Sequence, residues 1–305
     1  MKRNIRKITI CLAIATILVL SIVPSVIVAA ESNPYEKRKF DGPKIIFEEK
    51  AGSGDPKVPP EEKGKPDKPG KPPKPPEVDK WAVIVGAADY PGWINDLNYP
   101  DDDAVDMYNY LISIGYPEDN IKLLIDAKAK SGGIIRAIDW MNKQETEETS
   151  ECVFFFSGHG TTYDGYDDGD DEYTDEGIVA TDNVIILDGQ LRAKFSTFAS
   201  KKITFVFDTC FSGGMDDLIG EYTEYEYDGR TVATACDEDG YSYDGDETLL
   251  NGVFTYFFIE GLYSNNNIED AFSYAEPLAH NWVQQNYGEN MNPQLYDTYM
   301  GNWEF

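Results

Sequence analysis

The chain has few residues that could act as a base or a nucleophile near neutral pH. Histidine occurs only twice in 305 residues, as His159 and His280, and cysteine only four times. One cysteine falls within the first 30 residues, so the rest of the chain holds three, Cys152, Cys210 and Cys236. This odd number excludes a framework in which every cysteine joins an intrachain disulfide. A Cys152–Cys236 bridge stays open as an alternative, but we expect both thiols to pack in or near strands.

Basic residues are scarce in the part of the chain that we expect to fold. Of the 26 Lys and Arg residues, four lie in residues 1–30 and twelve in residues 31–80, which leaves ten. Of the 55 Asp and Glu residues, 44 follow residue 80, so the net charge there is −34. Such a charge argues against nucleic-acid binding, because phosphates would be repelled. It favours cationic peptides, polyamines or divalent metal ions as partners; the alternative is acid that serves only solubility.

The first 79 residues are not expected to belong to the folded domain. Residues 1–30 join a basic start to a long apolar run that ends in small residues, which is typical of a secretory signal peptide. The run is long enough to span a bilayer, so an uncleaved N-terminal membrane anchor is the alternative. Residues 31–79 are rich in Pro and Lys and predict an extended pro-region or linker. We expect an exported protein, secreted or at the cell surface, with one domain over residues 80–305.

Two apolar runs end in small residues followed by groups that could react. Residues 153–156 lead into Ser-Gly-His-Gly, which contains His159, and residues 203–207 lead into Asp-Thr-Cys-Phe-Ser-Gly-Gly, which contains Cys210. Runs of this kind are typical of buried parallel strands. Functional groups of open α/β sheets collect beyond the carboxyl ends of such strands. Neighbouring strands would place a thiol beside a base, which is the minimum for nucleophilic catalysis. His280 falls in a helical stretch and is expected to be structural.

Strand and helix patterns alternate along the domain and predict an α/β fold with a mostly parallel central sheet covered on both faces. Asn267 is expected to cap the last helix, and Pro277 to kink or divide it. We expect strands at 80–86, 120–125, 153–156, 203–207 and 229–235, and helices that begin at 101 and span 131–142, 251–262 and 268–284.

The segment at residues 164–177 breaks this alternation, because most of its side chains are carboxylates. Crowded carboxylates repel one another, and a bound hard cation such as calcium, which takes six to eight oxygen ligands, would relieve that repulsion. A solvated acidic loop is the alternative.

The order and spacing of these motifs resemble those of the caspase-like cysteine peptidases, and most closely the metacaspases and their prokaryotic relatives. The likeness runs from about residue 81 to residue 262, and His159 precedes Cys210 by the roughly 50 residues typical of caspases. It implies a caspase-like α/β/α sandwich in which Cys210 attacks a peptide carbonyl and His159 is the general acid and base. It also implies an oxyanion hole formed by the backbone N–H groups of Gly160 and Cys210.

The same resemblance implies a preference for cleavage after Arg or Lys. The acidic pocket of the family corresponds here to Asp103, Ser157 and Asp208. Pro100 stands where the family often has a cysteine, which leaves the shape of the pocket open.

The resemblance also implies calcium activation. Three of the aspartate positions that metacaspases use for it are matched in this chain by Asp175, Asp188 and Asp217. Gly189 stands where the family has a fourth aspartate. The calcium dependence of this chain therefore stays open at this point.

Two other functions are compatible with the sequence. The strand at residues 81–85 and the segment at residues 232–243 are similar to those of legumain-like peptidases, which select asparagine. A non-catalytic acidic module that binds calcium or cations at the cell surface is the second alternative. If the chain is a peptidase, self-processing is expected at basic sites, with Arg230, residues 201–202 and residues 37–39 as candidates.

Overall fold

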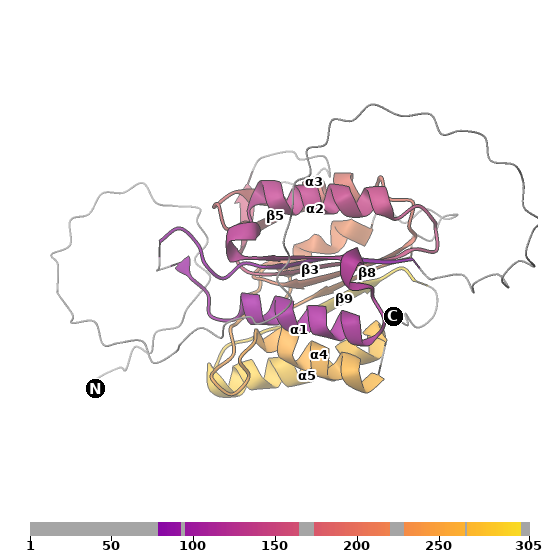
Figure 1. Ribbon diagram of the computed structural model, residues 1–305. Coiled ribbons are helices and arrows are strands. Elements are labelled where there is room, and N and C mark those ends of the chain that lie inside the picture. The colour runs from indigo at the N-terminus through magenta and orange to yellow at the C-terminus, as the bar shows by residue number, and fades with distance from the viewer. Residues whose placement is uncertain (1–78, 93–94, 165–173, 220–228, 266, 300–305) are drawn as a thin grey trace, which may run out of the picture. The chain divides into compact units, whose positions relative to one another are not determined.

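A mixed six-stranded sheet forms the centre of the domain (Figure 1). The computed structural model describes residues 79–92, 95–164, 174–219, 229–265 and 267–299. Across the sheet the strand order is β2-β1-β3-β7-β8-β9; all neighbours pair in parallel except β9, which is antiparallel to β8. The strands are β1 (Lys80–Gly86), β2 (Ile121–Ile125), β3 (Glu151–Ser157), β7 (Lys202–Asp208), β8 (Gly229–Thr234) and β9 (Gln294–Asp297).

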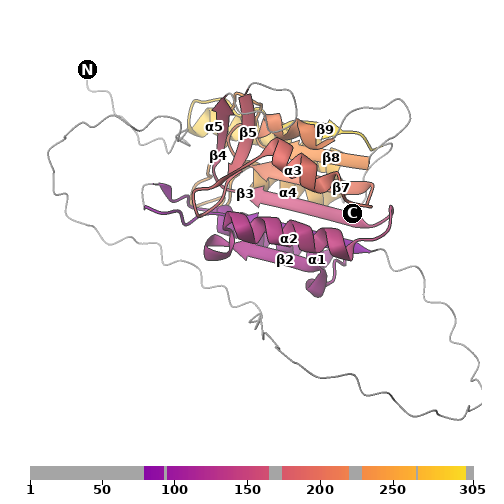
Figure 2. The ribbon, with the colours of Figure 1, turned by 90° about the horizontal axis from the view of Figure 1, so that it is seen from above.

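Helices cover both faces of this sheet, as the sequence predicts. Figure 1 shows α1 (Pro100–Ser113), α4 (Val253–Asn265) and α5 (Ile268–Asn286) on one side, and α2 (Ser131–Gln144) and α3 (Asp188–Phe195) on the other. Figure 2 shows α2 and α3 lying over the sheet from that second side. Successive strand residues alternate between the two layers: Ile84 packs toward α1 and α4, whereas Val85 packs toward α2. The α/β/α sandwich is therefore confirmed.

A small second sheet follows β3 and was not predicted. Its strands β4 (Gly160–Asp164), β5 (Thr174–Val179) and β6 (Ile185–Leu187) pair in antiparallel fashion. They are short, and acidic residues interrupt the alternation of apolar and polar residues by which such strands are recognised. Residues 165–173, most of the predicted acidic loop, lie outside the described residues.

Three short 3-10 turns complete the described elements, η2 (Glu118–Asn120), η3 (Asp126–Lys128) and η4 (Ser212–Ile219). The predicted cap of the last helix is confirmed, since the side-chain oxygen of Asn267 accepts the N–H of Asp270 at 2.7 Å. The predicted division at Pro277 is wrong, because α5 runs on to Asn286. Pro277 is exposed, so water can solvate the carbonyl that the proline leaves without an N–H partner.

The three cysteines of the domain are buried and form no disulfide. Cys152 lies within β3 and Cys236 just after β8, which excludes the bridge between them and confirms that both pack in or near strands. Burial raises the pKa of the Cys152 thiol far above its ordinary value and that of Cys236 to about 12, so both are held as neutral thiols. Within the described segments, no helix is both long and apolar enough to cross a membrane.

Candidate active site

The parallel pairing of β3 with β7 brings the two predicted reactive residues to one edge of the sheet. Ser157 pairs in register with Asp208, so His159 and Cys210 both lie two residues beyond the last paired position. The N–H of Gly158 also donates to the carbonyl of Asp208 at 3.2 Å. A Cβ atom at Gly160 would lie 2.1 Å from the carbonyl oxygen of Cys210. Only glycine lets the two chain segments approach so closely.

The imidazole of His159 is oriented by a backbone carbonyl and an aromatic ring. Its Nε2 lies 2.7 Å from the carbonyl oxygen of Asn95, which can only accept. Nε2 therefore carries the proton, and Nδ1 keeps a lone pair that can take up another. The ring of Tyr90 lies 4.6 Å from the imidazole, centroid to centroid. The hydroxyl of Tyr90 accepts the N–H of His159 at 3.0 Å and donates to the carbonyl of Val179 at 2.9 Å.

Sequence reasoning missed both orienting groups. Asn95 acts through its main-chain carbonyl, so no side-chain pattern marks it. Tyr90 is one of 20 tyrosines and lies in a turn-rich segment without a strand or helix pattern.

Cys210 sits on a tight backbone turn at the end of β7. Phe211 has φ 61°, a left-handed conformation that is costly for a residue with a bulky side chain. The N–H of Phe211 donates to the carbonyl of Gly240 at 2.9 Å, and its ring packs against Tyr241, which together hold the turn. The Sγ atom of Cys210 lies 3.7 Å from the carbonyl oxygen of Ser242. The residue is 1% exposed, so the thiol lies at the floor of the site.

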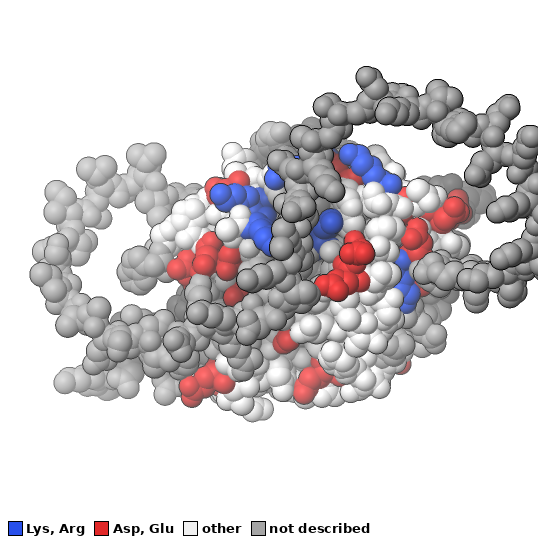
Figure 3. All heavy atoms as spheres, in the orientation of Figure 1, with Lys and Arg blue, Asp and Glu red and all other residues white. Residues whose placement is uncertain are grey.

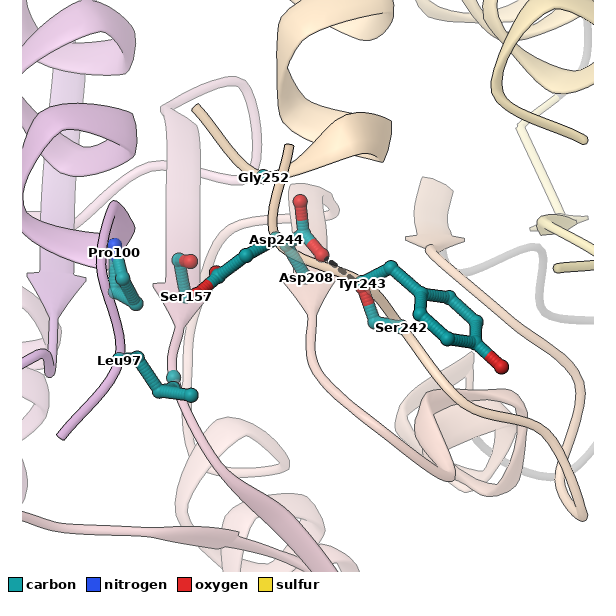
Figure 4. Close-up of a pocket in the computed structure, with 9 residues that line it drawn as sticks. Leu97, Pro100, Ser157, Asp208, Ser242, Tyr243, Asp244 and Gly252 are labelled. Atoms are coloured by element: carbon teal, nitrogen blue, oxygen red, sulfur yellow. Dashed lines mark hydrogen bonds between the residues drawn. The ribbon is translucent and has the colours of Figure 1, made fainter. Parts of the chain in front are cut away.

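A narrow pocket opens beside these residues, and its polar groups point inward (Figure 4). One carboxylate oxygen of Asp208 accepts the hydroxyl of Ser242, and the other accepts the N–H and hydroxyl of Thr255 at 2.9 and 2.7 Å. In Figure 4 the side chains of Ser157, Asp208 and Asp244 lie around a common space, whereas the ring of Tyr243 points away. The lining residues are Leu97, Pro100, Ser157, Gly158, Asp208, Ser242, Tyr243, Asp244 and Gly252.

A second buried carboxylate, Asp103, lies immediately behind this pocket. One of its oxygens accepts the hydroxyl of Ser157 at 2.7 Å, and the other accepts the N–H of Gly252 at 2.8 Å. A Cβ atom at Gly252 would lie 2.9 Å from Asp103 Oδ2 and 2.5 Å from Asp208 Oδ2, so the two carboxylates flank this glycine. The three residues predicted for the acidic pocket, Asp103, Ser157 and Asp208, are thus neighbours in the structure.

Burial raises the pKa of Asp103 well above its ordinary value, and the charge of Asp208 raises it further. Burial likewise raises the pKa of Asp208, although hydrogen bonds from Ser242 and Thr255 oppose the shift. Two buried like charges side by side favour a cation between them. Ser242 was noted in the sequence only as part of a legumain-like segment, and Thr255 was not recognised at all.

Comparison with known proteins agrees with this geometry. A family model described as a caspase domain matches residues 79–296. The chain belongs to the caspase-domain family of cysteine peptidases. Metacaspase-1 of Candida albicans is 32% identical over 157 residues, which are 46% of this chain and 34% of that protein. Metacaspase-6 of Arabidopsis thaliana is 31% identical over 173 residues, which are 51% of this chain and 45% of that protein.

The chain therefore aligns with less than half of each of these metacaspases. A Geobacter sulfurreducens protein of known crystal structure shares the fold with a TM-score of 0.51 at 17% identity; the match covers 73% of this chain and 94% of that protein. That likeness concerns the fold alone.

The aspartates predicted to bind calcium belong to β5, α3 and η4 of the caspase domain, and none of them lines the pocket beside Cys210. Asp175 in β5 and Asp188 at the start of α3 are fully buried. Asp217 in η4 contacts the guanidinium of Arg192 at 3.5 Å. Across the described ranges, no three His, Cys, Asp or Glu side chains are grouped as metal ligands. A Cβ atom at Gly214 would lie 2.2 Å from a carboxylate oxygen of Glu176, so η4 leaves room for that side chain.

The buried pair predicts an unusual dependence of stability on pH. Because the folded caspase domain holds the proton of Asp103 to higher pH than the unfolded chain does, stability falls as pH rises from the ordinary aspartate value of 3.8 through the raised pKa. Asp103→Asn should flatten this fall and stabilise the protein at neutral pH by about 0.5–2 kcal/mol, the usual gain when a conflict at a functional site is removed. Urea unfolding at several pH values measures it. Asp119→Asn, at an exposed acid, is the control, and equal profiles for both variants would contradict the argument.

Proposed function

We propose that the protein is an endopeptidase that uses Cys210 and His159. His159 Nδ1 takes the thiol proton as Sγ bonds to the peptide carbonyl carbon, and then delivers that proton to the departing amine. Water hydrolyses the thioester in the same way, restoring the thiol and releasing the new carboxylate. The geometry of the site supports this proposal. The register of β3 and β7 brings Cys210 and His159 to one edge of the sheet, and the Asn95 carbonyl assigns the proton to Nε2 and leaves Nδ1 as the base.

Developing negative charge on the carbonyl oxygen needs donors beside Cys210. The backbone N–H groups of Gly160 and Cys210 are proposed for this role, which is supported by the close approach of the two segments. Donors of this kind contribute about 3–4 kcal/mol each in acyl transfer.

The pocket beside Cys210 is proposed to select Arg or Lys on the amino side of the cleaved bond. Burial raises the cost of ionising both carboxylates, and the charge of Asp208 adds to the cost for Asp103. A guanidinium or ammonium between them removes that cost. An asparagine side chain, which the legumain-like alternative requires, is neutral and would leave the pair uncompensated. The charge of the pocket therefore favours basic residues over asparagine.

Substitution of the proposed nucleophile tests the reaction and its specificity together. Cys210→Ala should lower the cleavage rate of Arg- and Lys-containing peptides by at least about 10⁴-fold, because no other group can form the acyl intermediate. The measurement is kcat/KM on matched peptides with Arg, Lys, Asn or Asp before the cleaved bond. Cys152→Ala is the control, since this thiol is buried within β3.

Two results would contradict the proposal. Preference for the Asn peptide by the unmodified chain would support the legumain-like alternative. Failure to cut any peptide, with binding of cations retained, would support the non-catalytic module.

We also propose that calcium modulates the protein through Asp175, Asp188 and Asp217. Buried carboxylates suit this hard cation, which would neutralise their charge and join β5, α3 and η4. The guanidinium of Arg192 already contacts one of the three carboxylates, that of Asp217, and would therefore compete with calcium for it. Calcium binding then requires Asp217 to exchange Arg192 for the ion.

Removal of this guanidinium is the direct test. Arg192→Gln should tighten calcium binding by about two- to fivefold, because a partly exposed ion pair of roughly 0.5–1 kcal/mol no longer competes. Isothermal titration with CaCl₂ and calcium-dependent thermal shifts measure it. Lys194→Gln, two residues further along α3, is the control, because Lys194 pairs with Asp139 instead. Unchanged affinity in Arg192→Gln would refute the competition, and absence of calcium binding in the unmodified protein would refute the site.

Self-processing is proposed at exposed basic residues of the chain. Lys201 lies in the turn before β7 and is exposed, whereas residues 37–39 lie outside the described residues. The structure argues against Arg230, which is 5% exposed in β8 and donates its guanidinium to the carbonyls of Leu218 and Phe195.

Intact-mass analysis of the full chain tests self-processing. Fragments ending at Lys201, Lys202 or residues 37–39 should form in the unmodified protein and be missing from Cys210→Ala, because the thiol makes the cut. Fragments that form equally in both would identify a contaminating protease. A chain that stays whole while cutting peptides would contradict self-processing.

Export from the cytoplasm, to the medium or the cell surface, is proposed from the sequence of residues 1–30 alone. These residues, like the linker at 31–78, lie outside the described part of the structure.

A further inference from the structure

A second cavity, separate from the pocket beside Cys210, opens between α1 and α4. Its volume is about 220 Å³, and it shares no lining residue with that pocket. Figure 1 shows the two helices side by side beneath the sheet. The cavity is lined by Asp106, Asn251, Tyr256, Ile259, Glu260 and Tyr263.

Hydrogen bonds from neighbouring side chains hold the two carboxylates of this cavity in position. Asp106 accepts the side-chain amide of Asn251 at 3.1 Å. Glu260 accepts the hydroxyls of Tyr256 and Tyr274, each at 3.3 Å. Within the described segments, no ion pair involves Asp106 or Glu260. The cavity thus presents two oriented negative groups to an incoming ligand.

The helices around the cavity supply no internal cation for these groups. Neither α1, α4 nor α5 contains a Lys or an Arg, although together they contain eight Asp and Glu residues. On the face drawn in Figure 3, red groups but no blue ones lie over the lower part, where Figure 1 places α4 and α5. Basic side chains of the helices are confined to the opposite layer, in α2 and α3. A cation bound in the cavity must therefore come from another molecule or from outside these three helices.

Aromatic rings at the cavity favour an organic cation over a metal ion. Tyr263 is 59% exposed, and its ring is fixed edge-on against Tyr110, with centroids 5.1 Å apart. Tyr256 is fixed in the same way against Phe257, at 5.1 Å. A lysine or arginine side chain can place its charge at the carboxylates and over a ring face, while its methylenes pack on Ile259. A metal ion would gain nothing from the rings.

We propose that this cavity binds a second Lys or Arg side chain of the protein substrate, apart from the one beside the cleaved bond. The proposal rests on the proposed function. One loop connects the two sites: Asn251 donates to Asp106 in the cavity, and the next residue, Gly252, lines the cleavage pocket and donates to Asp103. A substrate seated in the cleavage pocket therefore lies next to the loop that leads from this pocket to the cavity. The preferred substrates are segments with clustered basic residues.

The test compares two peptides on the full chain. Both carry one Arg before the cleaved bond, and their flanks on each side carry either four lysines or four serines. The lysine peptide should show a KM about three- to tenfold lower, with equal kcat. The double variant Asp106→Asn/Glu260→Gln should abolish this difference and leave the serine peptide unaffected. Asp119→Asn/Glu147→Gln, which removes the same charge from exposed acids elsewhere, should preserve it.

Three results would overturn the proposal. The first is an equal KM for both peptides. The second is an equal loss of the KM difference in both double variants, which would indicate that the overall electrostatic field of the acidic domain attracts the lysines. The third concerns the chain's own basic segment, residues 63–76, which holds five lysines. If replacing those lysines by serine tightens binding of the lysine peptide, that segment, and not a substrate, is the occupant.

A binding measurement separates this proposal from the proposed function. Isothermal titration of the lysine peptide into full-chain Cys210→Ala needs no cleavage. Binding that Asp106→Asn/Glu260→Gln weakens supports the cavity even if the unmodified chain cuts no peptide. Binding that the variant leaves unchanged refutes the cavity even if cleavage after Arg is established.

Discussion

The parallel pairing of β3 with β7 is the constraint on which the site depends. The five middle residues of each strand are buried and, apart from Thr204 in β7, apolar, so hydrophobic burial fixes the place of both strands at the centre of the sheet. Their register then determines which residues emerge together at the carboxyl edge. A shift of one strand by a single residue would send every side chain to the opposite layer, so burial strongly specifies this register. The positions of His159 and Cys210 follow from packing that contains neither residue.

The acidic pocket lies at the same edge of the sheet, and its buried carboxylates make that edge less stable. Asp208 is the last residue of β7 and Asp103 lies in the first turn of α1, and both are buried next to Gly252. Hydrogen bonds from Ser157, Ser242 and Thr255 compensate the desolvation of these carboxylates only in part, since burial still raises the pKa of both. A pocket that is poorly compensated when empty gains most from a cationic side chain. The instability of the empty pocket and the selectivity that we propose for Arg or Lys would then have one cause.

The central sheet and the reactive pair could be predicted because strong local patterns mark them. Apolar runs of strand length predicted β1, β3, β7 and β8, and small residues after two of them marked His159 and Cys210. The resemblance to a family supplied Asp103 and Ser157, which no periodicity would have distinguished. Asn95 acts through its main chain, and Thr255 meets Asp208 only through tertiary packing, so neither leaves a trace in the sequence. The strands β4 to β6 were missed because they are short, and because acidic residues interrupt the apolar pattern in β5.

The excess of acid in the domain is divided among sites with different partners. Asp217 forms an ion pair within the protein, with Arg192 of α3. In the described part of the chain, Asp103 and Asp208 instead accept hydrogen bonds from neutral donors, which are the side chains of Ser157, Ser242 and Thr255 and the backbone N–H groups of Gly252 and Thr255. Such donors leave the charge uncompensated.

Among the described residues, Asp106 and Glu260 are likewise held by neutral amide and hydroxyl groups. Neutral donors orient a carboxylate without neutralising it, so they keep it available to a cation that arrives later. Basic side chains lie in α2 and α3, and the layer of α1, α4 and α5 lacks them. This separation keeps the protein's own cations away from the helices next to the cleavage pocket. Under the proposed function, the charge pattern therefore serves substrate binding as much as solubility.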